Sequence, residues 1–428
     1  MRAPIIGYVG LTHLGLNSAI TSAARGFQVV GYDDDEAMVA GLKHGVLPIS
    51  EPQLLELLVS LNSRLLFNSS PLCLSECDIV YISGDIPTDD QGNSDLAPVR
   101  VMLQSATGTM HPEAVLVILC QVPPGFTRLV NWPATQLYYQ VETLIFGRAV
   151  ERALHPERII LGCAHPFQPV DARLLSFLRA FDCPILPMRY ESAELAKISI
   201  NMFLVSAVAT ANTLAELCEE IGADWAEIVP SLRLDKRIGA HAYINPGLGL
   251  AGGNLERDLS TVLSYARAHN TDASVVAAWI AHSYYCKNWA LRKVQDLVLS
   301  HLPHAQLAVL GLTYKEETHS TKNSAGLALL QQLRGANVTV FDPSASLSSA
   351  GPEVRRAKTA LEATVNADVV LIMTPWPEFR TISAENLQEK MRGRIVIDPY
   401  RMLDTSNLRA RGFTHVVLGA PIDLDRER

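Results

Sequence analysis

Several polar side chains stand in otherwise apolar sequence at spacings that suit proton and hydride transfer. Lys197 and Asn201 lie four residues apart in a very apolar stretch, so a helix there would place both on one face. A lysine ammonium in such surroundings stabilises negative charge that develops on an alcohol oxygen, as an oxyanion-hole donor does. Asp258 follows Asn254 by four residues and would share its helical face, as a base acting directly or through water. Such groups can stabilise a developing charge and take up a proton.

Each of these residues also has a simpler structural interpretation. Lys197 could be a surface lysine paired with Glu194, three residues earlier. Asn254 follows two glycines and could cap a helix. Asp258 could be a first-turn charge that complements a helix dipole. The sequence alone leaves these alternatives open.

The first 33 residues have the pattern of a dinucleotide-binding unit. A short apolar strand, residues 5–9, runs through Gly7 and Gly10 into a helical stretch. A second strand, residues 27–32, ends at Asp33. Gly7 and Gly10 fit the second and third glycines of the phosphate-binding fingerprint, whereas the first glycine is missing. The alternative is a tight turn between strand and helix that binds nothing.

Asp33 indicates which dinucleotide would bind. The N-terminus of the first helix attracts a pyrophosphate, and an acid at the end of the second strand binds ribose hydroxyls. A carboxylate at that position repels the 2′-phosphate of NADP, and Asp34 and Asp35 add to this repulsion. The expected cofactor is therefore NAD.

The rest of the chain alternates between strand-like and helical segments. Apolar runs at 77–82, 114–120 and 158–162 predict a parallel sheet covered by helices. A long apolar helix is expected from Glu191 to about Gly222, a turn-rich stretch at 237–253, and helical sequence again at 254–299. The opening pattern then returns: a strand at 307–311 is followed by a helix at 324–333 and by further strands at 338–341, 368–373 and 394–397.

This order predicts an α/β fold with two Rossmann-like doubly wound domains joined by a long central helical region. The expected domains are residues 1–190, which bind NAD, 191–300, which are helical, and 301–428, which bind the substrate nucleotide. Long helices with mostly apolar faces need a partner, so a homodimer through the central helices is expected.

Composition excludes some classes of function. The net charge is −8 and no stripe of lysine or arginine is present, so nucleic acid is not an expected partner. No apolar run approaches the roughly 18 residues that span a bilayer, so no membrane is expected either. The seven cysteines are scattered and form no zinc set, which favours reduced thiols in the cytoplasm and no metal.

Five ordered motifs, spread over nearly the whole chain, resemble those of the nucleotide-sugar dehydrogenases, the UDP-glucose and GDP-mannose 6-dehydrogenase family. They are Gly7-Tyr8-Val9-Gly10-Leu11, Pro87-Thr88-Asp89 through Asp95-Leu96, Glu194-Leu195-Ala196-Lys197 with Asn201, Arg237-Ile238-Gly239 with Pro246-Gly247-Leu248-Gly249, and Gly311-Leu312-Thr313-Tyr314-Lys315.

The resemblance implies a role for each matching residue. Family members oxidise C6 of a sugar nucleotide from alcohol to carboxylate with two NAD molecules, through a cysteine that forms a thiohemiacetal and then a thioester. The implied catalytic residues are Glu142, Lys197, Asn201, Asn254 and Asp258. The implied cofactor residues are Gly7, Tyr8, Val9, Gly10, Leu11, Asp33, Gln121 and Lys322, and the implied substrate residues are Leu144, Arg237, Gly249 and Lys315. Of these, Arg237 would reach the sugar diphosphate across a dimer interface.

The chain departs from the family at the nucleophile. Asn254 stands where the cysteine is expected, and an amide cannot form a thioester. Gln121 replaces a threonine near the nicotinamide, and Phe146 replaces an acid four residues after Glu142. His319 and Ser320 also replace an acidic pair. The second oxidation by the covalent route is therefore in doubt.

Three functions remain open at this point. The first is a dehydrogenase that stops at the aldehyde or reaches the acid through a hydrate. The second is a full 6-dehydrogenase in which another group, with Cys120 and Cys163 the only candidates, replaces the cysteine. The third is a silent sugar-nucleotide-binding protein, against which the retained acid–base residues argue. The sequence does not identify the sugar, the nucleotide or the oxidised carbon.

Overall fold

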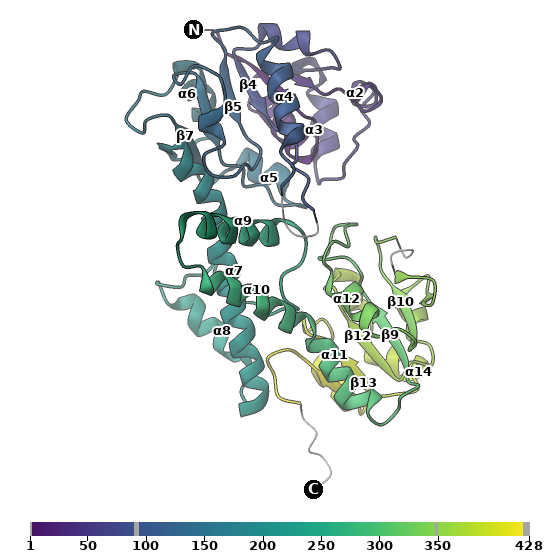
Figure 1. The fold of residues 1–428 in the computed structure, drawn as a ribbon. Coiled ribbons are helices and arrows are strands. Elements are labelled where there is room, and N and C mark those ends of the chain that lie inside the picture. Colours follow the sequence, from purple (N-terminus) through teal and green to yellow (C-terminus); the bar gives the residue numbers. More distant parts are fainter. Residues whose placement is uncertain (1, 90–93, 347–349, 423–428) are drawn as a thin grey trace. The chain divides into compact units, whose positions relative to one another are not determined.

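The computed structural model describes residues 2–89, 94–346 and 350–422 (Figure 1). Its chain divides into two compact units, Met1–Ile200 and Asn201–Arg428. Helix α7, Tyr190–Ile221, belongs to both, because the boundary falls within it. Residues 90–93, inside the loop motif predicted between Pro87 and Leu96, lie outside the described residues. The three-part division at residues 190 and 300 stays a prediction.

An eight-stranded sheet forms the centre of the first unit. Its order is β3-β2-β1-β4-β5-β6-β7-β8, and neighbouring strands are parallel except β6 and β7, which are antiparallel. The central strands β1, β4, β5 and β7 are almost wholly buried, which is why their sequences are largely continuous apolar runs. They are β1 Ile5–Val9, β2 Gln28–Tyr32, β3 Leu65–Asn68, β4 Ile79–Ile82, β5 Val115–Ile118, β6 Leu137–Gln140, β7 Ile159–Cys163 and β8 Ile185–Arg189.

Helices pack against this sheet through two apolar cores. Ile6 and Tyr8 of β1 belong to one core and Val9 belongs to the other, because side chains alternate between the faces of a strand. The helices of this unit are α1 His13–Ala24, α2 Glu36–Lys43, α3 Leu54–Ser60, α4 Ala97–Thr107, α5 Ala149–Leu154, α6 Ala172–Arg179 and the start of α7.

The second unit combines the central helices with a six-stranded parallel sheet. The strand order, β11-β10-β9-β12-β13-β14, repeats the order of the first six strands of the other sheet. The strands are β9 Gln306–Leu310, β10 Asn337–Phe341, β11 Arg355–Arg356, β12 Val369–Ile372, β13 Ile395–Ile397 and β14 Thr414–Val416. The helices are α8 Trp225–Leu234, α9 Asn254–His269, α10 Ser274–Lys287, α11 Trp289–Val294, a π-helical turn Gln295–Leu299, α12 Ala325–Gln332, α13 Ala360–Ala363, α14 Ala384–Lys390 and α15 Thr405–Ala410. The predicted α/β fold class is confirmed.

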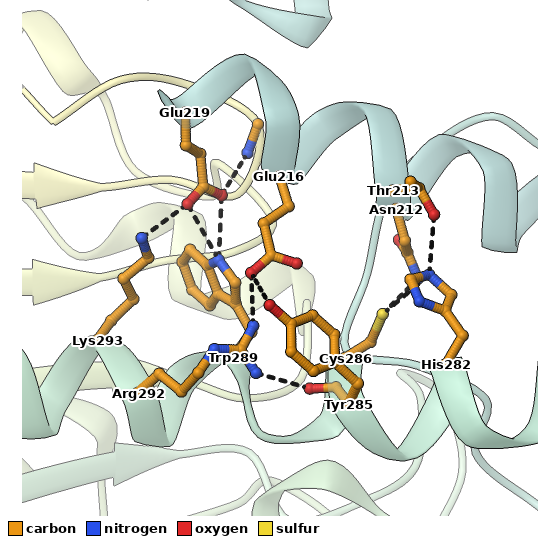
Figure 2. A network of polar contacts seen from close by, with 11 residues as sticks. Asn212, Thr213, Glu216, Glu219, His282, Tyr285, Cys286, Trp289, Arg292 and Lys293 are labelled. Carbon is orange, nitrogen blue, oxygen red and sulfur yellow. Dashed lines mark hydrogen bonds and ion pairs between the residues drawn. The ribbon is translucent and has the colours of Figure 1, made fainter. Parts of the chain in front are cut away.

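A polar network ties α7 to α10 and α11 within the second unit (Figure 2). The carboxylate of Glu219 is almost fully buried and accepts hydrogen bonds from Trp289 Nε1 and the Gly419 amide, and it pairs with Lys293 at 2.8 Å. Glu216 binds Arg292 at 2.6 Å and accepts from the Tyr285 hydroxyl at 2.8 Å. Because the buried Glu219 also accepts from the Gly419 amide, the network links α7 to the segment after β14 as well as to α11.

Helix α7 corrects one expectation. Among the described residues it is the one helix that is long and apolar enough to cross a membrane, by length and composition alone. Of its most apolar 18-residue stretch, 28% is buried in the structure. Its exposed apolar side chains include Phe203 at 78% and Ile221 at 66% exposure. The sequence reading missed this because single polar residues interrupt the apolar stretch.

Candidate active site

The glycine turn that follows β1 starts at Gly10, which shifts the predicted fingerprint, with its first place at Ile5, by five residues along the chain. Gly7 lies inside β1, paired with Val30 of β2 and Val80 of β4, so it belongs to the strand and not to the turn. Gly10 has φ +89°, and a Cβ there would lie 2.7 Å from the backbone of Gly84. The predicted assignment of Gly7 and Gly10 as the second and third glycines is therefore corrected, and Gly10 takes the first place.

The remaining turn residues follow from this register. Gly15 occupies the place of the third glycine, since a Cβ there would clash with the Gly10 carbonyl oxygen, and Thr12 stands in the second place. The side chains of Tyr8 and Val9 are buried in the two cores, and the Tyr8 hydroxyl bonds Ser22 at 2.8 Å. These two predicted cofactor residues thus lie within the strand, with side chains that face protein.

The residues of the turn fit a bound NAD. Thr12 makes no side-chain cap to α1, and no acidic residue of the helix lies in its first turn. The carboxyl of Asp85 lies at this helix end and accepts from the His13 amide, and burial raises its pKa above the usual range. The amides that follow His13 in the first turn are therefore the ones that suit a pyrophosphate. The carboxylate of Asp33 is partly exposed and accepts from the Leu11 amide at 2.7 Å and the Asp35 amide at 3.1 Å. Each oxygen can accept a further hydrogen bond, which leaves room for ribose hydroxyls.

Glu142 and Lys197 form an ion pair within the first unit. Lys197 Nζ lies 2.6 Å from Glu142 Oε1 and donates to the Glu142 carbonyl at 3.1 Å, and the side chains are 13% and 18% exposed. Glu142 Oε2 also accepts from the amide of Leu144 at 2.9 Å. The alternative that Lys197 is a surface lysine paired with Glu194 is therefore wrong.

Glu194 instead holds the loop that carries Gln121. Its carboxylate is fully buried and accepts hydrogen bonds from the amides of Gly125 and Thr127. Burial raises the pKa of Glu194 above the usual carboxyl range. Gln121, predicted near the nicotinamide, follows β5 and is partly buried. The strand orders of β1, β4 and β5 place this loop and the Gly10 turn at carboxyl ends of neighbouring strands, where such folds bind ligands.

A second polar group lies within the second unit. Asn201 Nδ2 donates to Asp258 Oδ2, and Arg257 lies beside the other oxygen, with Nε 3.4 Å from Oδ1. Asp258 is 1% exposed and is the fifth residue of α9, beyond the first turn, where Glu256 is the acid, so the alternative of a first-turn charge is wrong. Asn201 and Asp258, predicted separately, are thus brought together.

Asn254 is the first residue of α9 and is exposed. Gly253 occupies the cap position, so the alternative that Asn254 is the cap is wrong. The segment before α9 is braced by residues that follow β9. The Gly252 amide donates to the Lys322 carbonyl at 3.0 Å, and Asn323 Nδ2 donates to the Gly252 carbonyl at 3.1 Å. Lys322, predicted to bind the cofactor, therefore lies against the start of α9.

The predicted substrate residues have varied surroundings. Arg237 is exposed and pairs with Asp235 at 2.6 Å, so within a single chain it is a surface charge. Gly249 has φ +74° and packs directly against the Ser283 backbone. Lys315 is partly buried, with its ammonium 5.9 Å from the centre of the Tyr314 ring. Leu144 lies in the loop after β6 that Glu142 begins.

Two further residues were missed from the sequence. His13, at the start of α1, bonds Glu51, whose carboxylate also accepts from the amide of Gly147. Glu51 lies 38 residues from His13 and 96 residues from Gly147 in sequence, so no local pattern connects them. The only signal was a lone acid before Pro52 in an apolar stretch.

Three models of one family match successive parts of the chain. They are described as the NAD binding domain (residues 5–175), the central domain (residues 191–282) and the UDP binding domain (residues 308–405) of the UDP-glucose/GDP-mannose dehydrogenase family. The chain belongs to this family. It is therefore an NAD-dependent oxidoreductase of the nucleotide-sugar dehydrogenase type, with NAD as its cofactor and a nucleotide-sugar substrate.

Individual members of the dehydrogenase family match almost end to end. The UDP-glucose 6-dehydrogenase TuaD of Bacillus subtilis (strain 168) is 27% identical, over 97% of this chain and 93% of its own length. The UDP-glucose 6-dehydrogenase AglM of Haloferax volcanii is 29% identical, over 93% and 97%. A solved UDP-glucose dehydrogenase from Pyrobaculum islandicum aligns with a TM-score of 0.81 at 26% identity, covering 98% of each chain.

Proposed function

We propose that this dehydrogenase oxidises UDP-glucose or a closely similar nucleotide sugar at C6, and that it removes two electrons per sugar. The observation that carries the proposal is the Glu142–Lys197 pair, in which a largely buried ammonium lies 2.6 Å from a carboxylate. It belongs to the same unit as the Gly10 turn and Asp33, which suit NAD. The C6 position and the uridine nucleotide rest on the named relatives.

Bound NAD supplies the acceptor for the hydride that the alcohol carbon loses. Lys197 is the residue that stabilises the alcohol oxygen as negative charge develops on it, because its ammonium is held in a place with little water. Glu142 holds that ammonium through both its carboxylate and its carbonyl, so it orients the lysine. Asn201 is proposed as a further hydrogen-bond donor and Asp258 as a base that acts directly or through water, roles that rest on the motifs they match.

The limit of two electrons rests on the groups available as nucleophiles. Asn254 cannot form a thioester, and Phe146 offers no acid or base. Burial raises the pKa of Cys120 to about 12 and that of Cys163 to about 11, so neither thiol ionises readily near neutral pH. We therefore propose the aldehyde as the product.

We also propose a homodimer through the central helices, in the cytoplasm. The exposed apolar side chains along α7, among them Phe203, Leu217 and Ile221, suit burial against a second copy. The seven cysteines form no disulfide within the described residues, which suits a reducing compartment.

The test counts NADH formed per sugar consumed and weighs the product by mass spectrometry, with UDP-glucose first in a panel of sugar nucleotides. We expect one NADH and an aldehyde mass. Lys197→Met should lower kcat by about 1,000-fold, as loss of an oxyanion donor does, whereas the control Lys43→Met, at the end of α2, should leave it unchanged. Two NADH and a uronic acid would refute the two-electron limit, and binding without turnover for every sugar would support a silent binder.

A second variant examines the missing nucleophile directly. Asn254→Cys places a thiol at the exposed start of α9, where the helix dipole lowers the pKa of a cysteine. We expect this variant to trap the aldehyde as a thiohemiacetal, seen as an added mass on the protein, while Asn254→Ser forms no such adduct. Absence of the adduct would mean that position 254 does not meet the aldehyde.

A further inference from the structure

The side chain of Glu51 joins two segments of the first unit that take part in different steps of the reaction. Glu51 lies in the connection between α2 and α3, and its carboxylate is 1% exposed. One neighbour is His13, the first residue of α1, with Nε2 2.7 Å from Glu51 Oε1. The first residue of α1 is therefore bonded to a buried carboxylate.

The same carboxylate binds the loop that follows β6. The Gly147 amide donates to both oxygens of Glu51, at 2.9 and 3.1 Å, and the Ala149 amide donates at 3.4 Å. Phe146 adds a stacking contact, with its ring centre 4.0 Å from that of His13. The loop from Glu142 to Ala149 is thus held at both ends, by Lys197 at Glu142 and by Glu51 at its far end.

We infer that Glu51 is a positioning residue that couples NAD binding at the α1 turn to the placement of the Glu142 loop. His13 stands at the helix end that suits the pyrophosphate, so ordering of this end by the dinucleotide also orders the His13 ring. Because His13 and the loop amides share one buried carboxylate, a fixed ring favours a fixed loop. The inference rests on the proposed function only for the catalytic importance of Glu142.

Coupling of this kind acts in both directions. If NAD orders the loop, then an ordered loop strengthens NAD binding by the same factor. Removal of the carboxylate in Glu51→Ala should therefore weaken NADH binding about tenfold, which lies within the usual range of coupling energies. His13→Phe keeps the stacking on Phe146 but loses the polar link, so its effect isolates the link from the packing.

The experiment measures hydrogen–deuterium exchange of the full-length protein by mass spectrometry, with and without NADH and with no sugar. In the wild type, NADH should slow exchange of the peptide that contains residues 143–149 by about tenfold. In His13→Phe this slowing should disappear, although the Glu51 bonds to the loop remain. His13→Gln, whose amide can reach Glu51, should restore most of it.

Two controls separate this coupling from a general loss of structure. Asp171→Ala removes a carboxylate that caps α6 through the Arg173 amide, so it should lower the melting temperature but keep the NADH effect on the loop. An NADH effect in His13→Phe as large as in the wild type would overturn the inference. Since no sugar is present, this result is independent of turnover. If Lys197→Met kept full activity, the proposed catalytic pair would fail while the exchange result stood.

Discussion

The two sheets share one strand order and place an acid at the same point, yet they use that acid differently. Asp33 directly follows β2, is partly exposed and accepts two backbone hydrogen bonds. Asp342 follows β10 at the matching place and is 5% exposed. Its two oxygens accept from the amides of Leu312, Thr313, Ser344 and Ala345, and from the side chains of Thr313 and Trp376.

The spacing of glycines explains this difference. In the first unit Gly15 follows Gly10 after five residues, and the short turn leaves the first amides of α1 for an anion. In the second unit Gly311 and Gly326 stand in the same places, since Gly311 has φ +99° and a Cβ at Gly326 would lie 2.5 Å from the Gly311 oxygen. Fifteen residues separate them, and Asp342 holds the start of this longer connection. One position thus serves a ligand in one domain and a loop in the other.

The largest expected effect is on stability, in Asp342→Ala. Three buried amides and the partly buried amide of Ser344 would lose their acceptor. A buried amide left unpaired costs about 1–3 kcal/mol, so we expect a loss of about 4 kcal/mol after relaxation and water entry. Chemical denaturation followed by circular dichroism measures it. A loss below about 1 kcal/mol would mean that the carboxylate of Asp342 does not stabilise its loop, and this would contradict the proposed difference between the two domains.

The matching change in the first unit, Asp33→Ala, should act on the cofactor. Loss of a charged acceptor for ribose hydroxyls should weaken NADH binding about 30-fold, because such a bond contributes about 2 kcal/mol. NADH fluorescence titration gives the Kd. Preference for NADH over NADPH should also fall, since the charge that repels the 2′-phosphate is gone. An unchanged Kd for both dinucleotides would remove Asp33 from the cofactor site.

Two acids at the amino ends of the central strands, Asp368 and Asp78, should have smaller effects on stability. Asp368 accepts from the Gln306 amide at the start of β9, and its bonds with the Arg392 guanidinium hold the pKa of its carboxyl below the usual range. A lowered folded-state pKa contributes stability that is present above the unfolded pKa of about 4 and is lost as the pH falls below it. Asp368→Asn should therefore cost about 2 kcal/mol at pH 7 and less at pH 3. A cost that does not change with pH would contradict the role of the charge.

The equivalent acid of the first unit should matter less. Asp78 accepts from the Ile5 amide at the start of β1, but its arginine, Arg2, is 3.7 Å away and largely exposed. Asp78→Asn should cost about 0.5–1 kcal/mol at pH 7, as expected for a weak surface pair and one partly retained hydrogen bond. The same denaturation series measures both variants. Equal losses for Asp78→Asn and Asp368→Asn would show that Arg392 adds nothing.

Much of the fold could be predicted because central strands are continuous apolar runs. The strand at residues 5–9 and the long helix from about residue 191 were placed closely, and the return of the pattern after residue 306 was seen. The missed strands are short or lie at an edge. Strand β8 is apolar, but Pro187 interrupts it and argues against a strand. Strand β11 consists of two exposed arginines and carries no apolar signal.

Several residues of the candidate site could be predicted from the sequence, but their contacts and the register of the glycine turn could not. Two glycines three residues apart allowed two registers, and only the pairing of Gly7 inside β1 decides between them. Lys197 and Asn201 were found through their helical spacing, but their partners, Glu142 and Asp258, lie more than 50 residues away. Such long-range contacts depend on how the elements pack, which single-sequence patterns do not contain. The role of Glu51 was invisible for the same reason.

The brace between Asn323 and the segment before α9 limits how this chain can be cut and recombined. A fragment that ends at Leu299 would keep Asn254 and α9 but lose the side chain that bonds the Gly252 carbonyl and Glu256. The face of Tyr314 against which Gly252 packs would go as well. Exchange of the C-terminal sheet for that of a relative would therefore also replace the support under residue 254. An exchange that moves residues 252–256 together with Tyr314 and Asn323 keeps these contacts.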